Sequence, residues 1–448
     1  MRVIECIALA TLVLTSILYS QAKILTLEQS KQAALENNLN VVQAQNNIEG
    51  AQSDVLAAYG SYLPTLGVSG GWNRTQSDVA GSTTEIIGGQ PVPIPASFSV
   101  TNRFSTRLDL SYTVFDGFAR EASFSSAKSN AIATEHQSAR TRQTIVYDVE
   151  RGYLNVLRNE QLVKVSEENL KRGRRQLERI TESNRVGALS LADVYRQQSQ
   201  VAADELNLIN AQNDYEKSKA DLIALIGLDV SEEYELADPA ISKTISKLEL
   251  DATLERYSDF LALSQRALAS RPDYMSAKEF LYASESGETA ARSGYFPSII
   301  ASAGYGLSSE QISNLSNNKN ITWGINFRWD LFDGFRTNQA LLSASVTKRN
   351  AEISLIQAER DINVELKKAL LDLDAARKQY EVSQKGLISA TEDRKIAEAR
   401  YNLGAGTLLD LLTGNAGLVN AQASQVNATY GYILAKRSLE FVIGEKTY

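Results

Sequence analysis

The sequence predicts a mainly α-helical chain in which long helices are combined with a smaller amount of β-structure. Three observations support this fold class. Several short motifs occur twice in the same order, two proline-free segments of about 65 residues carry a seven-residue apolar repeat, and four short segments alternate polar and apolar residues. Only seven prolines occur among 448 residues. Because proline is the residue that most often interrupts a helix, long continuous helices are expected.

The first 22 residues have the pattern of a secretory signal peptide. Arg2 gives a positive start, residues 6–19 are apolar, and small residues at Ser20 and Ala22 precede a cleavage site. The apolar stretch is short for a membrane anchor, which is the alternative. Cleavage after Ala22 would remove Cys6, the only cysteine of the chain. We therefore expect an exported mature chain without disulfides.

An internal repeat divides the remaining sequence into two halves. The motif Phe-Asp-Gly-Phe occurs at 115–118 and again at 332–335, and Gly187-Ala188 recurs as Gly404-Ala405 at the same offset of 217 residues. A shared offset over such distances is the signature of duplicated structure. The predicted parts are a first structural repeat over 23–228, a connector over 229–250 and a second structural repeat over 251–448.

Alternating polarity predicts two β-hairpins, one over about 65–114 and one over about 298–331. In the first, large apolar residues recur at even positions near its end, whereas Arg107 and Asp109 take odd positions. Runs of about ten residues suit a tilted transmembrane strand, but a soluble hairpin with one wet face alternates in the same way. The large aromatic face favours the membrane. The longer loop of the first half, about 73–102, is rich in glycine and proline and is expected to lack strands.

A long helical hairpin is predicted after each β-hairpin. The proline-free segments run roughly over 119–183 and 336–402, and at 1.5 Å per residue each would extend about 100 Å. Each is expected to turn near Gly187 or Gly404 and to return as a second helix. Shorter helices are expected before the strands, over about 27–62 and 254–295. A seven-residue repeat, typical of helices that pack along one seam, runs along both long segments. Its members are Val149, Val156, Val163, Leu170 and Leu177, then Leu366, Leu373, Tyr380 and Leu387.

The predicted strands place a requirement on assembly. Four strands cannot close a barrel, and lipid does not tolerate an open sheet edge. Eight strands are the practical minimum for a membrane barrel. If the strands lie in a membrane, several copies of the chain must therefore join. Helices of about 100 Å far exceed the thickness of a bilayer and must then project into water.

The composition argues against enzymatic and nucleic-acid-binding functions. The chain has one His, one Cys and a net charge of −7. It contains no phosphate-binding loop, dinucleotide fingerprint or metal-spaced cluster of ligands. We expect no catalytic residues, no cofactor, no metal and no nucleic-acid partner. A secreted or periplasmic coiled-coil structural protein or adhesin without channel activity is the alternative from another class.

These features together resemble the TolC family of outer-membrane channel proteins. The resemblance implies a homotrimer with a twelve-stranded β-barrel in outer-membrane lipid and a long α-barrel projecting into the periplasm. It also implies an exit duct for a tripartite export system, in which a periplasmic adaptor (membrane fusion) protein joins the duct to an inner-membrane ABC or proton-driven pump. Small-molecule efflux and type I protein secretion both remain open. The motifs that carry the resemblance are Leu63-Pro64 and Phe296-Pro297 before the strands, Phe-Asp-Gly after them, and the helical turns 187–193 and 404–410.

The resemblance also implies a periplasmic gate at the two turns. Asp410, Tyr401 and Asp193 stand where the family has gate aspartates and a gate tyrosine. Gly406 and Thr413 stand where some members carry a gate arginine and a second aspartate, so the resting state of this gate stays open to question. Each aspartate also has the spacing of a helix-capping acid, and for Asp410 capping and gating are compatible. Three copies of Asp410 around an axis would repel one another and attract cations.

The same turns are candidate contacts for the adaptor, on resemblance alone. Their glycines have a simpler explanation as well, since they supply turn geometry between helices. The candidate residues are Gly187, Ala188, Leu189, Gly404, Ala405 and Gly406.

Overall fold

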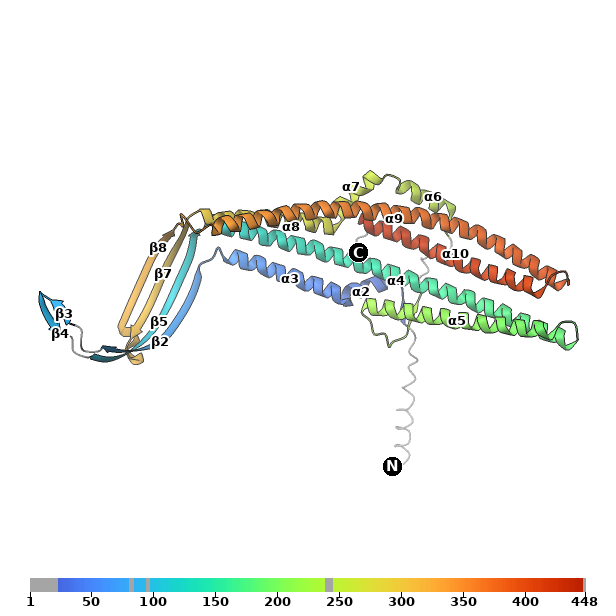
Figure 1. The fold of residues 1–448 in the computed structure, drawn as a ribbon, viewed down its shortest axis with the longest axis horizontal. Helices are drawn as coiled ribbons and strands as arrows, with labels where there is room; N and C mark the ends of the chain where they lie inside the picture. The colour runs from blue at the N-terminus through green and yellow to red at the C-terminus, as the bar shows by residue number, and fades with distance from the viewer. Residues whose placement is uncertain (1–22, 80–83, 94–96, 238–244, 446–448) are drawn as a thin grey trace, which may run out of the picture. The chain divides into compact units, whose positions relative to one another are not determined.

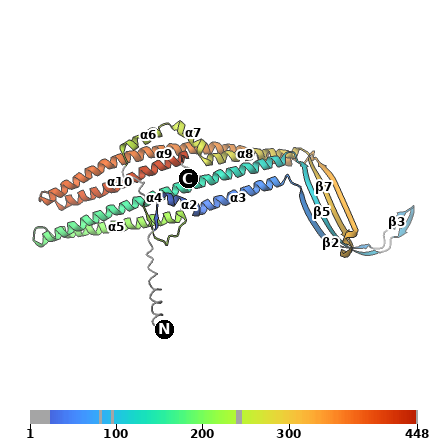
Figure 2. The same ribbon diagram turned by 180° about the vertical axis from the view of Figure 1, so that it is seen from behind.

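The structure of the chain is a computed structural model, shown from two sides in Figures 1 and 2. The predicted signal peptide, 1–22, lies outside the described residues. No helix in the described part of the chain is both long enough and apolar enough to cross a membrane. The structure describes residues 23–79, 84–93, 97–237 and 245–445.

The chain forms two compact units, and each sequence half contributes to both. The helical unit comprises the described parts of 1–47, 135–275 and 356–448, and the strand unit comprises those of 48–134 and 276–355. The division into sequence repeats at 228 and 251 stays a prediction.

Helices account for most of the described chain, and the two longest each contain 67 residues without interruption. The absence of proline from both segments explains this continuity. The helices are α2 (Leu27–Asn37), α3 (Leu39–Gly60), α4 (Ala119–Arg185), α5 (Leu191–Ile226), α6 (Lys247–Arg256), α7 (Phe260–Ser270), α8 (Pro272–Arg292), α9 (Arg336–Asn402) and α10 (Leu408–Ile443).

The shorter predicted helices are interrupted, which corrects the expectation of one helix in each place. The segment 27–62 holds two helices, because Asn38 has an extended backbone (φ −67°, ψ 125°) and its side-chain amide donates to a carbonyl of α5 at 2.8 Å. The segment 254–295 is also divided, since Arg271 is extended directly before Pro272. A residue before proline is disfavoured in an α-helix.

Most members of the predicted seven-residue seams are buried in the helical unit, whereas Val163, Leu177 and Leu387 are only partly buried. In α4, Val149 and Val156 are fully buried in one cluster with Tyr153. In α9, the equivalent residues Leu366 and Leu373 are buried in a second cluster. Each such side chain stabilises the fold by about 1.5–3 kcal/mol. Strand β1 (Lys23–Leu25) is attached to this core through its parallel pairing with β6 (Tyr234–Leu236).

The strand unit contains one antiparallel four-stranded sheet in the order β2-β5-β7-β8. The strand register agrees with the alternation of polar and apolar residues in the sequence. Leu108 of β5 lies opposite Val68 of β2 on one side and opposite Tyr305 of β7 on the other. One face is therefore apolar and aromatic, whereas the opposite face carries small polar residues and glycine. In this single chain, β2 and β8 are the two edges. The strands are β2 (Thr65–Val79), β5 (Ser97–Phe115), β7 (Ser298–Ser309) and β8 (Asn318–Arg328).

The loop expected over 73–102 is shorter than predicted, because both flanking strands extend into it. It also contains a small hairpin of β3 (Thr84–Ile87) and β4 (Gln90–Pro93), which the expectation of a strand-free loop missed. Gly88 and Gly89, with φ of 62° and 82°, supply the tight turn between them. Consecutive glycines with positive φ are typical of a two-residue hairpin turn.

Each Phe-Asp-Gly-Phe motif makes the same backbone turn from a strand into a long helix. Phe118 and Phe335 have φ of 70° and 68°, and the glycine before each is also left-handed. Positive φ is rare for a bulky residue, so its occurrence at equivalent positions identifies a repeated turn. At the second turn, Asp333 caps α9 by accepting hydrogen bonds from the Thr337 amide at 2.7 Å and hydroxyl at 2.6 Å.

Candidate functional site

Two helical turns at one end of the helical unit hold the predicted gate residues. Figures 1 and 2 show the α4–α5 turn and the α9–α10 turn at the same end. Gly187 and Gly404 have φ of 78° and 72°, which a side chain would strain. The amide of the next residue closes each turn at 2.8 Å: Ala188 onto the Ser183 carbonyl, and Ala405 onto the Arg400 carbonyl. The two turns are therefore built alike.

The second turn is locked by a reciprocal capping box. The Asp410 amide donates to the Thr407 hydroxyl at 3.2 Å, and the Asp410 carboxylate accepts from the Thr407 amide at 2.9 Å. The first turn is only half of this arrangement. Ser190 accepts from the Asp193 amide, but the Asp193 carboxylate accepts from the Ser190 hydroxyl at 2.7 Å rather than from its amide. The predicted capping role is thus complete for Asp410 and partial for Asp193.

Asp410 is exposed, so its carboxylate caps α10 while facing solvent. The hydrogen bond from the Thr407 amide, followed by that from its hydroxyl, lowers the pKa of Asp410 below the ordinary value. The positive end of α10 favours the same charged form. The side chain is therefore a fixed negative charge at the tip of the second hairpin at neutral pH.

A small apolar cluster joins the two turns. Ile180 of α4, Val194 of α5 and Leu408 of α10 are buried together, with exposures of 1%, 6% and 5%. Leu189 and Tyr401 pack against them as partly buried members. The fold thus brings Tyr401, the predicted gate tyrosine of the second turn, onto the first turn, and hydrophobic contact is the main force that joins them.

Tyr401 and Asp193 are brought close without a direct hydrogen bond. The Tyr401 hydroxyl is buried and makes no hydrogen bond of normal geometry. Burial raises its pKa, the negative charge of Asp193 raises it further, and Arg179 and Gln176 oppose the shift. Asp193 instead holds Arg196, at 3.2 Å. The contact between the turns at Tyr401 therefore depends on packing rather than on polar bonding.

Gly406 and Thr413, which stand where some members of the TolC family carry an arginine and an aspartate, have different surroundings. A Cβ at Gly406 would lie 3.1 Å from the Arg400 Cβ and 3.3 Å from the Tyr401 amide nitrogen. An arginine at 406 would therefore need the end of α9 to shift. Thr413 is exposed on α10 and demands no such shift. Of the candidate adaptor residues, Leu189 and Gly406 are partly buried, whereas the other four are exposed.

Sequence reasoning missed the polar contacts between the two hairpins. Arg179 of α4 lies 3.8 Å from Glu398 of α9, and Glu398 also pairs with Arg394 at 2.9 Å. Both Arg179 and Glu398 are substantially exposed, so this pair contributes at most about 1 kcal/mol. This ion pair could not be predicted from a local sequence pattern, because its two residues lie far apart along the chain. The seven-residue spacing does place Arg179 on a face of α4 different from that of Leu177.

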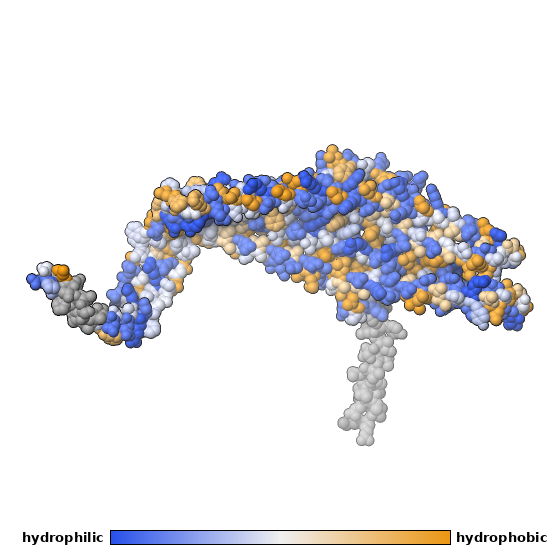
Figure 3. All heavy atoms as spheres, in the orientation of Figure 1, coloured by the Kyte–Doolittle hydropathy of each residue, from blue (hydrophilic) through white to orange (hydrophobic). Residues whose placement is uncertain are grey.

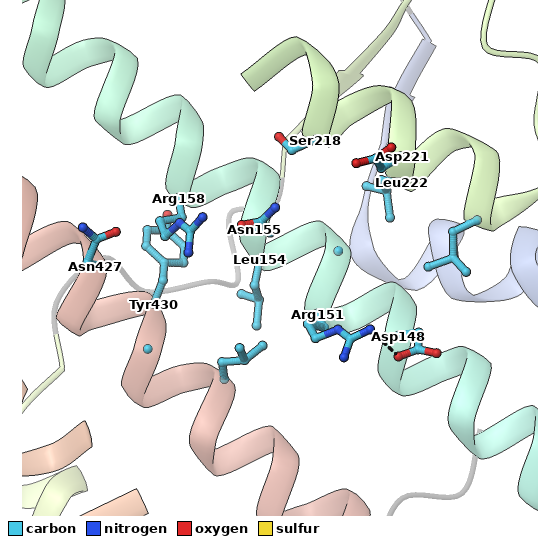
Figure 4. Close-up of a pocket in the computed structure, with 14 residues that line it drawn as sticks. Asp148, Arg151, Leu154, Asn155, Arg158, Ser218, Asp221, Leu222, Asn427 and Tyr430 are labelled. Carbon is cyan, nitrogen blue, oxygen red and sulfur yellow. Dashed lines mark ion pairs between the residues drawn. The ribbon is translucent and has the colours of Figure 1, made fainter. Parts of the chain in front are cut away.

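A cavity of about 440 Å³ lies between α4, α5 and α10, away from the turns. Figure 4 shows Arg158 beside Tyr430, and the ion pair of Arg151 with Asp148, which measures 2.9 Å. Two helix-interior glycines, Gly152 and Gly431, are among its lining residues. None of the predicted gate or adaptor residues lines this cavity.

Comparisons with known proteins agree over almost the whole chain. The family model described as outer membrane efflux protein matches residues 31–228 and 263–445. The probable efflux pump outer membrane protein TtgC of Pseudomonas putida is 26% identical over 436 residues, which cover 94% of this chain and 83% of that protein. The outer membrane protein TolC of Vibrio cholerae is 25% identical, with coverages of 92% and 89%.

Solved structures show the same fold. The outer membrane protein VceC of Vibrio cholerae matches with a TM-score of 0.77 at 20% identity, and the match covers 93% of this chain and 96% of that one. The outer membrane channel CmeC of Campylobacter jejuni matches with a TM-score of 0.76 at 20% identity, covering 93% and 85%.

Proposed function

The chain belongs to the outer membrane efflux protein family, and from this premise we propose that three copies form one closed duct from the periplasm through the outer membrane. Members of the family are channels, and this chain is an outer-membrane exit duct for efflux rather than an enzyme. Its helices extend into the periplasm. The alternative of a coiled-coil adhesin or structural protein is not favoured, because its sequence relatives are efflux proteins.

The sheet supports closure by three copies. Both edge strands, β2 and β8, have an unpaired side in the single chain. Unpaired backbone groups are not tolerated in hydrocarbon, so a membrane sheet must close on itself. Three sheets of four strands give twelve, which is within the range of membrane barrels. The apolar face then meets lipid and the polar face lines the interior.

The strongest single support for association is a second apolar face on α9. Leu366 and Leu373 point into the core of the helical unit. Leu371 and Val382 lie on the opposite side of the helix and are 57% and 67% exposed. A helix that is apolar on both sides is normally buried on both. Figure 3 shows apolar residues, in orange, exposed between polar ones along the helices.

The duct is one component of a pump assembly, as its efflux relatives indicate. We place the adaptor contact at the exposed turn residues, chiefly Gly187, Ala188, Gly404 and Ala405. The inner-membrane pump is of ABC or proton-driven type. Relatives whose names specify antibiotic efflux, toluene efflux or pyoverdine export support small-molecule export over type I protein secretion.

The gate is formed by Tyr401, Asp193 and Asp410 at the two turns. Tyr401 holds the turns together through the apolar cluster, and Asp193 stands close enough to influence its pKa. Asp410 presents its charge to solvent. In a trimer, three Asp410 carboxylates at the narrow end would select cations.

Site-specific cross-linking tests the partner assignment. A cysteine at Ala188 is exposed, and the natural Cys6 lies within the first 22 residues. Captured partners are identified by mass spectrometry, with a cysteine at the exposed Ala220 of α5, remote from the turn, as the matched control. Capture of an adaptor with a proton-driven pump supports efflux, whereas an adaptor with an ABC exporter supports secretion. Capture of neither, by a well-expressed trimer, contradicts the adaptor contact at this turn.

A further inference from the structure

The polar face of the sheet is made almost entirely of small side chains. Serine, threonine, asparagine and glycine occupy most of its positions in β2, β5, β7 and β8. The charged residues on this face of the described strands are Arg103, Arg107, Asp109 and Arg328. Arg107 is therefore one of few long side chains in the middle of this face.

Arg107 lies flat across the sheet instead of standing away from it. Its Nε donates to the carboxylate of Asp109, two residues along β5. Its Nη2 donates to the hydroxyl of Thr322 at 3.4 Å. Thr322 belongs to β8, so the side chain crosses the whole width of β7.

Gly304 provides the space for this crossing. The ladder places Gly304 of β7 opposite both Asp109 and Thr322. A Cβ at Gly304 would lie 2.9 Å from the Arg107 Nη2, 3.0 Å from the Thr322 hydroxyl and 3.1 Å from the Asp109 Oδ1. Glycine within a strand often marks such a close approach. The neighbouring Gly306 differs, because a Cβ there would meet nothing nearer than 3.9 Å.

We propose that Arg107, held down over Gly304 by Asp109 and Thr322, is the residue that sets ion selectivity and bore in the strand part of the duct. This inference rests on the proposed closure of the sheet by three copies. Closure puts three copies each of Arg103, Arg107 and Asp109 on the interior wall. The three Arg328 side chains of the same face are each paired with Asp330, at 2.9 Å, and add no surplus charge. The surplus positive charge favours anionic solutes over cationic ones of the same size.

The experiment reconstitutes the full chain in planar bilayers and measures the reversal potential in a salt gradient. Arg107→Ser should shift the permeability ratio toward cations by about twofold at 0.1 M salt, the scale of three screened unit charges, one from each copy, at about 10 Å. Asp109→Asn should shift it toward anions. Arg107→Lys, which keeps the charge, should restore the wild-type ratio. Because the exposed Arg107–Asp109 pair contributes little to stability, these variants should still fold.

Two glycine variants test the width of the bore separately from the charge of its wall. Gly304→Ala lifts the Arg107 side chain off the wall without changing any charge, so the single-channel conductance should fall. Gly306→Ala adds the same methyl group on the same strand and face, where space is open, and should leave the conductance unchanged.

The outcomes separate this inference from the proposed function. A wild-type chain that forms neither a trimer nor a channel overturns both. A wild-type channel whose selectivity is the same in Arg107→Ser and Asp109→Asn overturns the role of Arg107 alone. Opposite shifts in these two variants, with a conductance change in Gly304→Ala only, support it.

Discussion

Asp410 combines a helix cap and a solvent-exposed charge in one carboxylate. Its hydrogen bonds with Thr407 complete the cap of α10, while its exposure leaves the charge effective in solvent. The sequence predicts this cap, since a hydroxyl followed three residues later by an acid is a local pattern. The contact between Tyr401 and the cluster of Ile180 and Val194 is not local and depends on the fold. Cap residues could thus be predicted from sequence, whereas their spatial neighbours could not.

Replacement of Asp410 by asparagine should weaken the cation selectivity of the channel, measured as a reversal potential in planar bilayers. The matched variant Thr407→Ala removes a cap worth about 1 kcal/mol but keeps the carboxylate, so selectivity should persist. Because hydrogen bonds lower the pKa of Asp410, its contribution should be present above the ordinary value of about 4 and disappear only as pH falls through the lowered value. Equal selectivity in wild type and Asp410→Asn would contradict the charge role.

Tyr401 should act through its ring rather than through its hydroxyl. Because the hydroxyl makes no normal hydrogen bond, Tyr401→Phe should leave the contact between the two turns intact. Tyr401→Ala should lose about 1–2 kcal/mol of local stability, or roughly 5–30-fold faster amide exchange at 183–190 and 401–408. Hydrogen-exchange mass spectrometry checks both variants. Faster exchange in Tyr401→Phe would show that a polar link holds the turns.

At the scale of helices and strands, periodic patterns predicted the buried faces of the long helices, whereas single residues did not predict where elements break. The seven-residue seams correctly identified buried Val149, Val156, Leu366 and Leu373, because burial on one helix face requires that spacing. The break at Asn38 escaped prediction because its cause is a hydrogen bond to a distant helix. The β3–β4 hairpin escaped prediction because glycine and proline, which are frequent in this segment, are typical of irregular loops as well as of hairpin turns.

Arg271 joins three elements at the junction of α7 and α8. It is 2% exposed, and its guanidinium contacts Asp273 at 2.6 Å and Glu365 at 2.7 Å. Burial alone would raise the pKa of Asp273, but the hydrogen bond and charge of Arg271, with the charge of Arg140, lower it instead. The stabilising effect of Asp273 is therefore present above the ordinary pKa of about 4 and is lost as pH falls through the lowered value.

Arg271→Ala should destabilise the helical unit by about 1.5–3 kcal/mol, the scale of lost hydrogen bonds to charged groups. The loss is limited because Glu365 is half exposed and Arg140 remains 3.5 Å from Asp273. Thermal unfolding in detergent measures the loss. Arg185→Ala, which removes an exposed i,i+3 pair with Glu182, should change the midpoint little and serves as the control. Equal midpoints for the two variants would show that the Arg271 network is dispensable.

At the scale of the whole molecule, the proposed association surface lies on the outer apolar face of α9. Leu371→Glu places a charge on its outer apolar face and should prevent trimer formation, because an unpaired charge is costly to bury between copies. Leu248→Glu is the matched control, since Leu248 of α6 is 82% exposed and lies outside this face. Native mass spectrometry of detergent-extracted protein distinguishes trimer from monomer. Trimers in both variants would show that the outer apolar face of α9 does not form the interface between copies.

Disulfide trapping between sheet edges tests the central claim, the closure of one duct by three chains, most directly. A cysteine at Ser69 of β2 is combined with a cysteine at each position of β8 from 320 to 326 in turn. Within one chain β2 and β8 are three strand spacings apart, roughly 14 Å, and a disulfide requires Cα atoms less than about 7 Å apart. The account predicts covalent trimers at the pairing that matches the register. Monomers alone at every pairing, in protein properly inserted in the outer membrane, would contradict it.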